Sequence, residues 1–226
     1  KIVHIQTGTD SGKTFNEYLN KYTSVDYLKM SDYKSINDLL NSLNHYNTVI
    51  IGHHQPDKTP WNKYRFSKKE LSWIDQISKM KNTILTVFAK PYALNNLPNL
   101  DSFKSIIISY QNGYIFQQKT AQMIFGALQF NGVVPVSISN KIKVGEGLKT
   151  SKINRLSYGL PESENIDSEK LKKIDSIVKF AIDSSMTPGV QLLVARNSKV
   201  IYEKNYGKLR YNKDKSVNLY TKYDLA

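Results

Sequence analysis

Short apolar runs separated by amphipathic stretches occupy the first 140 residues, and this alternation constrains the fold more than any other feature. Runs suited to buried parallel strands cover residues 2–5, 48–51, 83–88 and 105–109. A further run at 133–138 contains Pro135, which lacks the N–H group that a central strand needs. We therefore expect that run at an edge or an end of the sheet.

Amphipathic helices are expected between these runs. Two of them follow the spacing i, i+3, i+4, i+7, with Ile36, Leu39, Leu40 and Leu43 in one and Ala121, Ile124, Phe125 and Leu128 in the other. A third carries Leu71, Ile74 and Ile77, and Ser67 and Glu70 precede it at the spacing of a capping box. Strand–helix alternation predicts an α/β fold, an open three-layer αβα sandwich with a mostly parallel sheet.

The pattern changes in the last third of the chain. Glycines and polar residues without periodicity indicate a linker over 141–166. Asp167 or Ser168 can then cap a helix whose apolar face is Leu171, Ile174, Ile177, Val178, Ala181 and Ile182. Strand-like runs at 190–195 and 199–203 flank Asn197 and Ser198, which predicts a hairpin. One helix and one hairpin cannot bury a core alone, so we expect 167–226 to be part of a larger α+β domain that follows a sandwich domain at 1–140.

Charge and cysteine content exclude few functions. The net charge is +13, but residues 1–150 carry 18 basic and 10 acidic groups and residues 151–226 carry 14 and 9, so the excess is dispersed. Arg, which favours bidentate phosphate contacts, occurs only at 65, 155, 196 and 210. We therefore expect a solvated basic surface and no nucleic-acid partner. The chain has no cysteine, which excludes disulfides and thiolate catalysis, and no apolar stretch long enough to span a bilayer.

Two motifs suggest ligand sites. Residues from Gly8 to Thr14 (GTDSGKT) stand where a phosphate loop would be, but only three residues separate the two glycines where that loop has four. His53 and His54 follow a buried strand, yet adjacent histidines point different ways and no partner is spaced for a metal. A turn with Asp10 or Ser11 as a cap explains the first motif, and we expect no metal and no cofactor. A nucleotide-binding domain remains an alternative.

Residues 121–138 (AQMIFGALQFNGVVPVSI) resemble the closing signature of the C-terminal sandwich domain of glycoside hydrolase family 3. That signature has a helix ending in Phe-Gly, a loop with a second Gly, and then Leu-Pro-Val, with Val134 here in place of the Leu. Upstream, the residues from Phe88 to Leu94 (FAKPYAL) are similar to the family's strand followed by a Pro-Tyr turn. The similarity covers about residues 1–140.

The end of the chain resembles the opening helix and hairpin of serine β-lactamase-like, penicillin-recognising domains. The similar residues are Ile174-Asp175, 188–196 (PGVQLLVAR), 200–202 (VIY) and Tyr206-Gly207. In that family, a stretch like 221–226 (TKYDLA) is followed by the S-x-x-K motif with the nucleophile. Together the two resemblances imply a large secreted or periplasmic bacterial β-N-acetylglucosaminidase.

The resemblance implies that this chain carries no catalytic residue. In family 3 the nucleophilic Asp lies on an upstream (β/α)₈ barrel of the same chain, and in this branch a His on a barrel loop is the acid/base. The loop 52–65 has no Glu here and only Asp57 as a carboxylate, which fits that branch. Asp10, His53, His54 and Tyr92 are the candidates for the rim of a carbohydrate pocket. A carbohydrate or cell-wall binding module is the other alternative.

Overall fold

The computed structural model describes residues 1–57, 64–212 and 214–224. The chain divides into two compact units, Lys1–Ile153 and Asn154–Ala226. The segment 141–166, expected as a linker, is shared between them, because Ile153 N donates to the carbonyl oxygen of Gly126 while Ser157 N donates to that of Ser198.

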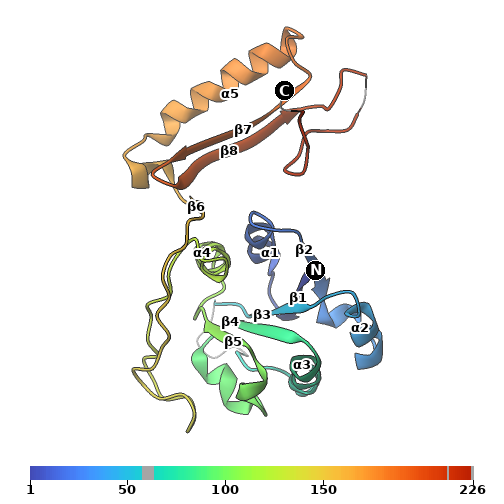
Figure 1. Cartoon of the computed structure of the whole chain (residues 1–226), viewed down its shortest axis with the longest axis vertical. Coiled ribbons are helices and arrows are strands. Elements are labelled where there is room, and N and C mark those ends of the chain that lie inside the picture. The colour runs from blue at the N-terminus through green and yellow to red at the C-terminus, as the bar shows by residue number, and fades with distance from the viewer. Residues whose placement is uncertain (58–63, 213, 225–226) are drawn as a thin grey trace. The chain divides into compact units, whose positions relative to one another are not determined.

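A five-stranded parallel sheet forms the centre of the first unit, in the order β2-β1-β3-β4-β5 (Figure 1). The strands are β1 (Ile2–Gly8), β2 (Val25–Lys29), β3 (Thr48–His54), β4 (Asn82–Phe88) and β5 (Ser105–Ile108). Most residues of β1, β3 and β4 are buried, because both faces of the sheet are covered. This is the open αβα sandwich that the alternation predicts.

Helices cover the two faces of the sheet in separate layers (Figure 1). On one face α1 (Lys13–Leu19) and α4 (Tyr114–Ile124) bury Phe15, Leu19 and Ala121 against Ile50 and Phe88. On the other face α2 (Ile36–Ser42) and α3 (Lys68–Met80) bury Leu39, Ile74 and Ile77 against the odd-numbered residues of β1, β3 and β4. The sheet therefore separates two apolar cores.

Two predictions about the strands need correction. The β2 segment was not expected, because VDYLK is only half apolar and lies at the sheet edge, where β1 is its one neighbour. The run 133–138 is not a strand: Val134 N donates to the carbonyl oxygen of Glu146 and its own carbonyl accepts from Gly145 N. Ile138 N also bonds locally, to the carbonyl oxygen of Ile142, and the next residue, Ser139, forms an isolated bridge to Ile142.

The start of α3 is tied to the end of β1 by one carboxylate. The expected capping box is confirmed, since Ser67 Oγ accepts from Glu70 N and Glu70 Oε2 accepts from Ser67 N at 2.7 Å. The other oxygen, Oε1, accepts from Gly8 N at 2.7 Å. Gly8 adopts φ +82°, a left-handed conformation that turns the chain out of the strand.

The second unit contains the antiparallel hairpin of β7 (Gly189–Arg196) and β8 (Lys199–Gly207), with β6 (Ser157–Tyr158) beside β8. Asn197 and Ser198 both have positive φ, as a two-residue type I′ turn requires. Asp167 caps α5 (Ser168–Asp183) by accepting from Glu169 N. The apolar face of α5 differs from expectation at Ile177, which is 68% exposed because the buried stripe runs through Val178, about 100° further round the helix.

Asp175 joins α5 to β8. Its carboxylate accepts from Tyr202 Oη at 2.6 Å, from Tyr206 Oη at 2.5 Å and from Lys204 Nζ at 2.8 Å. The three donors alternate along β8 and so share one face of the strand. Bonds from Lys204, Tyr202 and Tyr206 hold the pKa of the Asp175 carboxyl well below its usual range.

Short 3₁₀ helices complete the fold. They are η1 (Met30–Asp32), η2 (Pro91–Asn96), η3 (Leu100–Ser102) and η4 (Pro161–Glu164).

The capping box can be tested by Ser67→Ala, which removes the side-chain acceptor of Glu70 N. We expect the free energy of unfolding of the first unit to fall by about 1 kcal/mol, the usual worth of such a cap. Buried Trp73 lies in α3, so tryptophan fluorescence during urea unfolding reports on this unit. The control is Ser72→Ala at an exposed position inside the same helix, and an equal loss in both variants would contradict the assignment.

Candidate functional site

A cavity of about 830 Å³ opens at the carboxyl ends of β1, β2 and β3. Ligands of open α/β sheets bind at this edge, where the strand order reverses direction; here β2 lies on one side of β1 and β3 on the other. The lining residues come from the ends of these three strands, from the segment before α3 and from its first turn: Gln6 to Thr9, Met30, Ser31, Gln55, Tyr64 to Ser67, Lys69 and Glu70.

His53 supports one wall of this cavity from below. Its Nε2 is 3.1 Å from the carbonyl oxygen of Tyr64, which can only accept, so the ring proton is on Nε2. Nδ1 then accepts from the Thr7 hydroxyl at 3.0 Å. The ring also stacks on Phe66 with a centroid distance of 3.8 Å. One buried imidazole therefore connects β1 with the segment that leads into α3.

The charged groups of the cavity do not form a catalytic pair. Glu70 is the one carboxylate among the described residues that line it, and its two oxygens already accept from the backbone N–H groups of Gly8 and Ser67. Lys69 Nζ lies 4.1 Å from the centroid of the Trp73 ring and donates to the carbonyl oxygen of Tyr33. Hydrolysis by two carboxylates needs a second acid within about 10 Å, which this lining does not contain.

None of the four residues expected at a pocket rim lines this cavity. His53 lies beneath it, and His54 lies on the opposite face of the sheet, where its Nδ1 is 2.7 Å from Asn112 Oδ1. Asp10 accepts from Asn112 Nδ2 at 2.9 Å, so Asp10 and His54 share a partner. Tyr92 is exposed in η2 and is not among the residues that line the cavity.

The sequence reasoning missed the residues that do line the cavity. Gln6 and Gln55 sit at the ends of β1 and β3, so their places after apolar runs were a usable signal. Tyr64 and Glu70 had no such signal, because they reach the cavity only through the folding of the segment before α3.

Five of the seven backbone N–H groups between Gly8 and Thr14 are already bonded within the protein. The donors and their acceptors are Gly8 to Glu70, Asp10 to the carbonyl of His54, Ser11 to Asp10, Gly12 to Gln6 and Lys13 to Ser11. Gly12 also packs on the His54 ring, and an added Cβ would lie 2.5 Å from its Nε2. A phosphate loop needs these N–H groups free for its ligand, so the geometry argues against nucleotide binding here.

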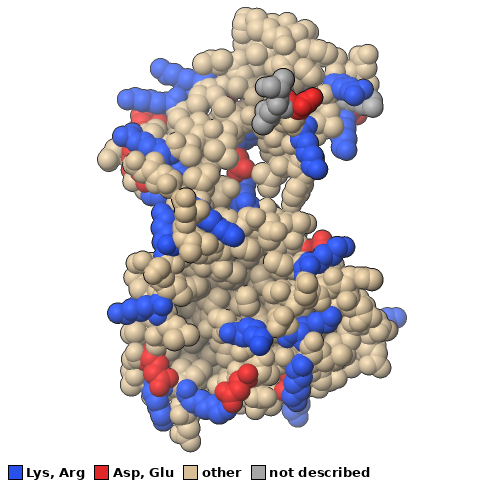
Figure 2. Space-filling view, viewed as in Figure 1, with Lys and Arg blue, Asp and Glu red and all other residues tan. Residues whose placement is uncertain are grey.

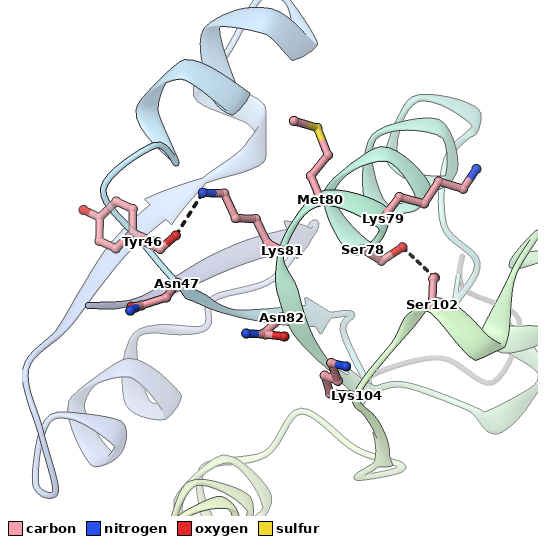
Figure 3. A pocket seen from close by; sticks show the side chains of 9 residues that line it. All are labelled: Tyr46, Asn47, Ser78, Lys79, Met80, Lys81, Asn82, Ser102 and Lys104. Atoms are coloured by element: carbon pink, nitrogen blue, oxygen red, sulfur yellow. Dashed lines mark hydrogen bonds between the residues drawn. The ribbon is translucent and has the colours of Figure 1, made fainter.

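A second cavity of about 580 Å³ lies at the other edge of the sheet, near the start of β4 (Figure 3). Lys79, Lys81 and Lys104 line it, and Lys81 Nζ donates to the carbonyl oxygen of Tyr46. Among the described residues, its lining contains no carboxylate and no histidine.

Charged side chains are dispersed over the surface, as the sequence indicates. Figure 2 shows basic side chains spread over the visible face of each unit with acidic ones among them. Within residues 1–57, 64–212 and 214–224, no group of three or more His, Asp or Glu side chains could hold a metal ion. No helix in these described stretches has the length and apolarity to cross a membrane.

Comparison with known proteins gives little information. No protein-family model and no curated protein sequence matches the chain. A solved structure of beta-glucoside phosphorylase BglX is similar to 61% of the chain, with a TM-score of 0.43 and 18% sequence identity. The match covers 26% of that protein, so this chain spans about a quarter of its length.

Three buried histidines make the first unit sensitive to acid. Burial lowers the pKa of His53 and of His54 to about 4, and burial beside His54 lowers the pKa of His4 well below its ordinary value of 6.5. The folded state therefore binds fewer protons than the unfolded chain between pH 6.5 and about 4. Stability is lost as pH falls through this window.

We expect the free energy of unfolding to fall by about 1.4 kcal/mol per pH unit for each histidine that stays neutral. Urea unfolding followed by tryptophan fluorescence between pH 7 and pH 4.5 measures this slope. His53→Gln should reduce it, with His45→Gln, which removes an exposed imidazole, as the matched control. A slope unchanged by His53→Gln would contradict the account.

Magnesium with ATP or GTP should leave the melting temperature of the chain unchanged. A ligand that binds only the folded state must raise its stability, by about 2.7 kcal/mol at a hundredfold excess over Kd. Most backbone N–H donors of the segment from Gly8 to Thr14 are already bonded within the protein, so no such shift is expected. A concentration-dependent rise that Gly12→Ala abolishes would establish the nucleotide-binding alternative.

Proposed function

We propose that this chain is a non-catalytic accessory part of a glycoside-acting enzyme. Its parent is a retaining β-N-acetylglucosaminidase of the family 3 type, in which an upstream (β/α)₈ barrel carries the nucleophile. The first unit presents a cavity to the carbohydrate substrate, and the second unit begins a serine β-lactamase-like domain.

The cavity at the carboxyl ends of β1 to β3 is the observation that carries this proposal. Its lining joins two aromatic rings, Tyr64 and Phe66, to amide and hydroxyl groups from Gln6, Gln55 and Ser31. Neutral hydroxyl and acetamido groups of a sugar match such donors and acceptors. Its single carboxylate is held by two backbone N–H groups, so the same cavity can bind a sugar without cleaving a glycosidic bond.

The local geometry of the signature segments supports the family. The helix α4 ends at Ile124, and Phe125 and Gly126 follow, with Gly126 in the left-handed conformation at φ +73°. Only glycine fits comfortably there, because an added Cβ would lie 2.8 Å from the Ile153 side chain. Pro91 and Tyr92 start a 3₁₀ turn three residues after β4, as the Pro-Tyr part of the signature implies.

Binding of N-acetylglucosamine and turnover of its aryl β-glycoside test the proposal on the same protein. We expect weak binding in an isothermal titration and no release of the aryl alcohol. Tyr64→Ala should weaken binding about tenfold, which corresponds to about 1.4 kcal/mol. Tyr92→Ala is the matched control, because Tyr92 is exposed in the same unit and lies outside the cavity.

Two outcomes count against the proposal. Turnover by this chain alone would place an acid–base pair among its own residues. Binding that is lost in Tyr92→Ala and retained in Tyr64→Ala would move the sugar site away from the cavity.

A further inference from the structure

Three buried side-chain atoms in the described part of the chain have no hydrogen-bond partner: His4 Nε2, His54 Nε2 and Thr86 Oγ1. An unpaired buried polar atom is costly, so each calls for a partner. The three residues come from β1, β3 and β4, which are neighbours in the sheet. One site could therefore account for all of them.

The three atoms lie on the same face of the sheet around Gly52. Gly52 and His54 are two residues apart on β3 and so point to one face, and Thr86 is in register with Gly52 on β4. A Cβ added to Gly52 would lie 2.4 Å from His54 Nε2 and 2.6 Å from His4 Nε2. Both nitrogens therefore lie close to the Gly52 backbone, on the side where a side chain would project.

Both nitrogens are acceptors. The Asn112 amide is oriented by its Nδ2 group, which donates to Asp10 Oδ2 at 2.9 Å, so its Oδ1 faces His54 Nδ1 at 2.7 Å. An amide oxygen only accepts, and the ring proton of His54 is therefore on Nδ1. We assign His4 the same tautomer, because its Nδ1 lies 3.3 Å from Asn16 Oδ1. Two bare Nε2 lone pairs cannot bond to each other, so they need a donor between them.

We propose that Gly52 forms the floor of a site for one buried water molecule, which donates to Nε2 of His4 and of His54 and accepts from the Thr86 hydroxyl. These three bonds satisfy every unpaired atom at once, and three is the usual number for a buried water. A side chain at Gly52 would clash with both imidazole nitrogens, so glycine is needed for the two rings to approach this site. The site stabilises the fold beneath the loop from Gly8 to Lys13.

A cuprous ion is the other small ligand that two imidazole lone pairs could take. The Thr86 hydroxyl favours water, because its proton needs an acceptor and a cation supplies none. Burial also keeps both imidazoles uncharged by lowering their pKa. The metal is therefore an outcome for the experiment to exclude.

The direction of the stability change in Thr86→Val tests the proposal. Valine has the shape of threonine without the hydroxyl, so with the water in place the variant loses one hydrogen bond. We expect the folding equilibrium constant of the full chain to fall about three- to tenfold, measured by urea unfolding with tryptophan fluorescence. Thr83→Val is the matched control for a hydroxyl with a known partner, since buried Thr83 donates to the carbonyl oxygen of Lys81.

An unchanged or higher stability of Thr86→Val would overturn the proposal, because removal of a truly unpaired hydroxyl is neutral or stabilising. A high-resolution crystal structure adds a direct readout. An ordered oxygen within hydrogen-bond distance of both Nε2 atoms supports the water site. Stabilisation by added Cu(I) that is lost in His4→Phe would replace the water with a metal.

Discussion

Burial of the parallel sheet on both faces is the constraint on which the rest of the first unit depends. The strands β1, β3 and β4 have almost no exposed residues, so each polar side chain on them needs a partner inside the protein. Polar side chains gather toward the carboxyl ends of the strands, because the strands end there and the following loops supply hydrogen-bond acceptors. The cavity, the loop from Gly8 to Lys13 and the site around Gly52 all lie toward these ends.

Neighbouring histidines show how the strand distributes these groups. His53 and His54 point to opposite faces, since side chains alternate along a strand. His53 bonds to Thr7 and to the carbonyl of Tyr64 and thereby supports the wall of the cavity. His54 bonds to Asn112 and, through it, is linked to Asp10. Two adjacent residues with the same chemistry therefore hold two different parts of the molecule.

Carboxylates serve mainly to hold elements together in both units. Glu70 joins the end of β1 to the start of α3, and Asp175 joins α5 to β8. A carboxylate whose oxygens accept such bonds is a poor candidate for proton transfer, because its ionised form is the bonded one. This use of acidic residues is consistent with a proposed role in binding and not in catalysis.

The sequence alone determined the layers of the fold. Apolar runs of β1, β3, β4 and β5, the helical spacing in α2, α3 and α4, the capping box at Ser67 and the hairpin turn at Asn197 were all readable, because each depends on residues close in the chain. Only the tertiary structure decided where the ligand cavity lies and which side chains line it. Tyr64 and Gln55 line the same cavity only because distant segments pack together, and no local spacing in the sequence records that packing. The same reason explains the errors at 133–138, at β2 and at Ile177: whether a short apolar pattern is buried depends on which distant segments cover it.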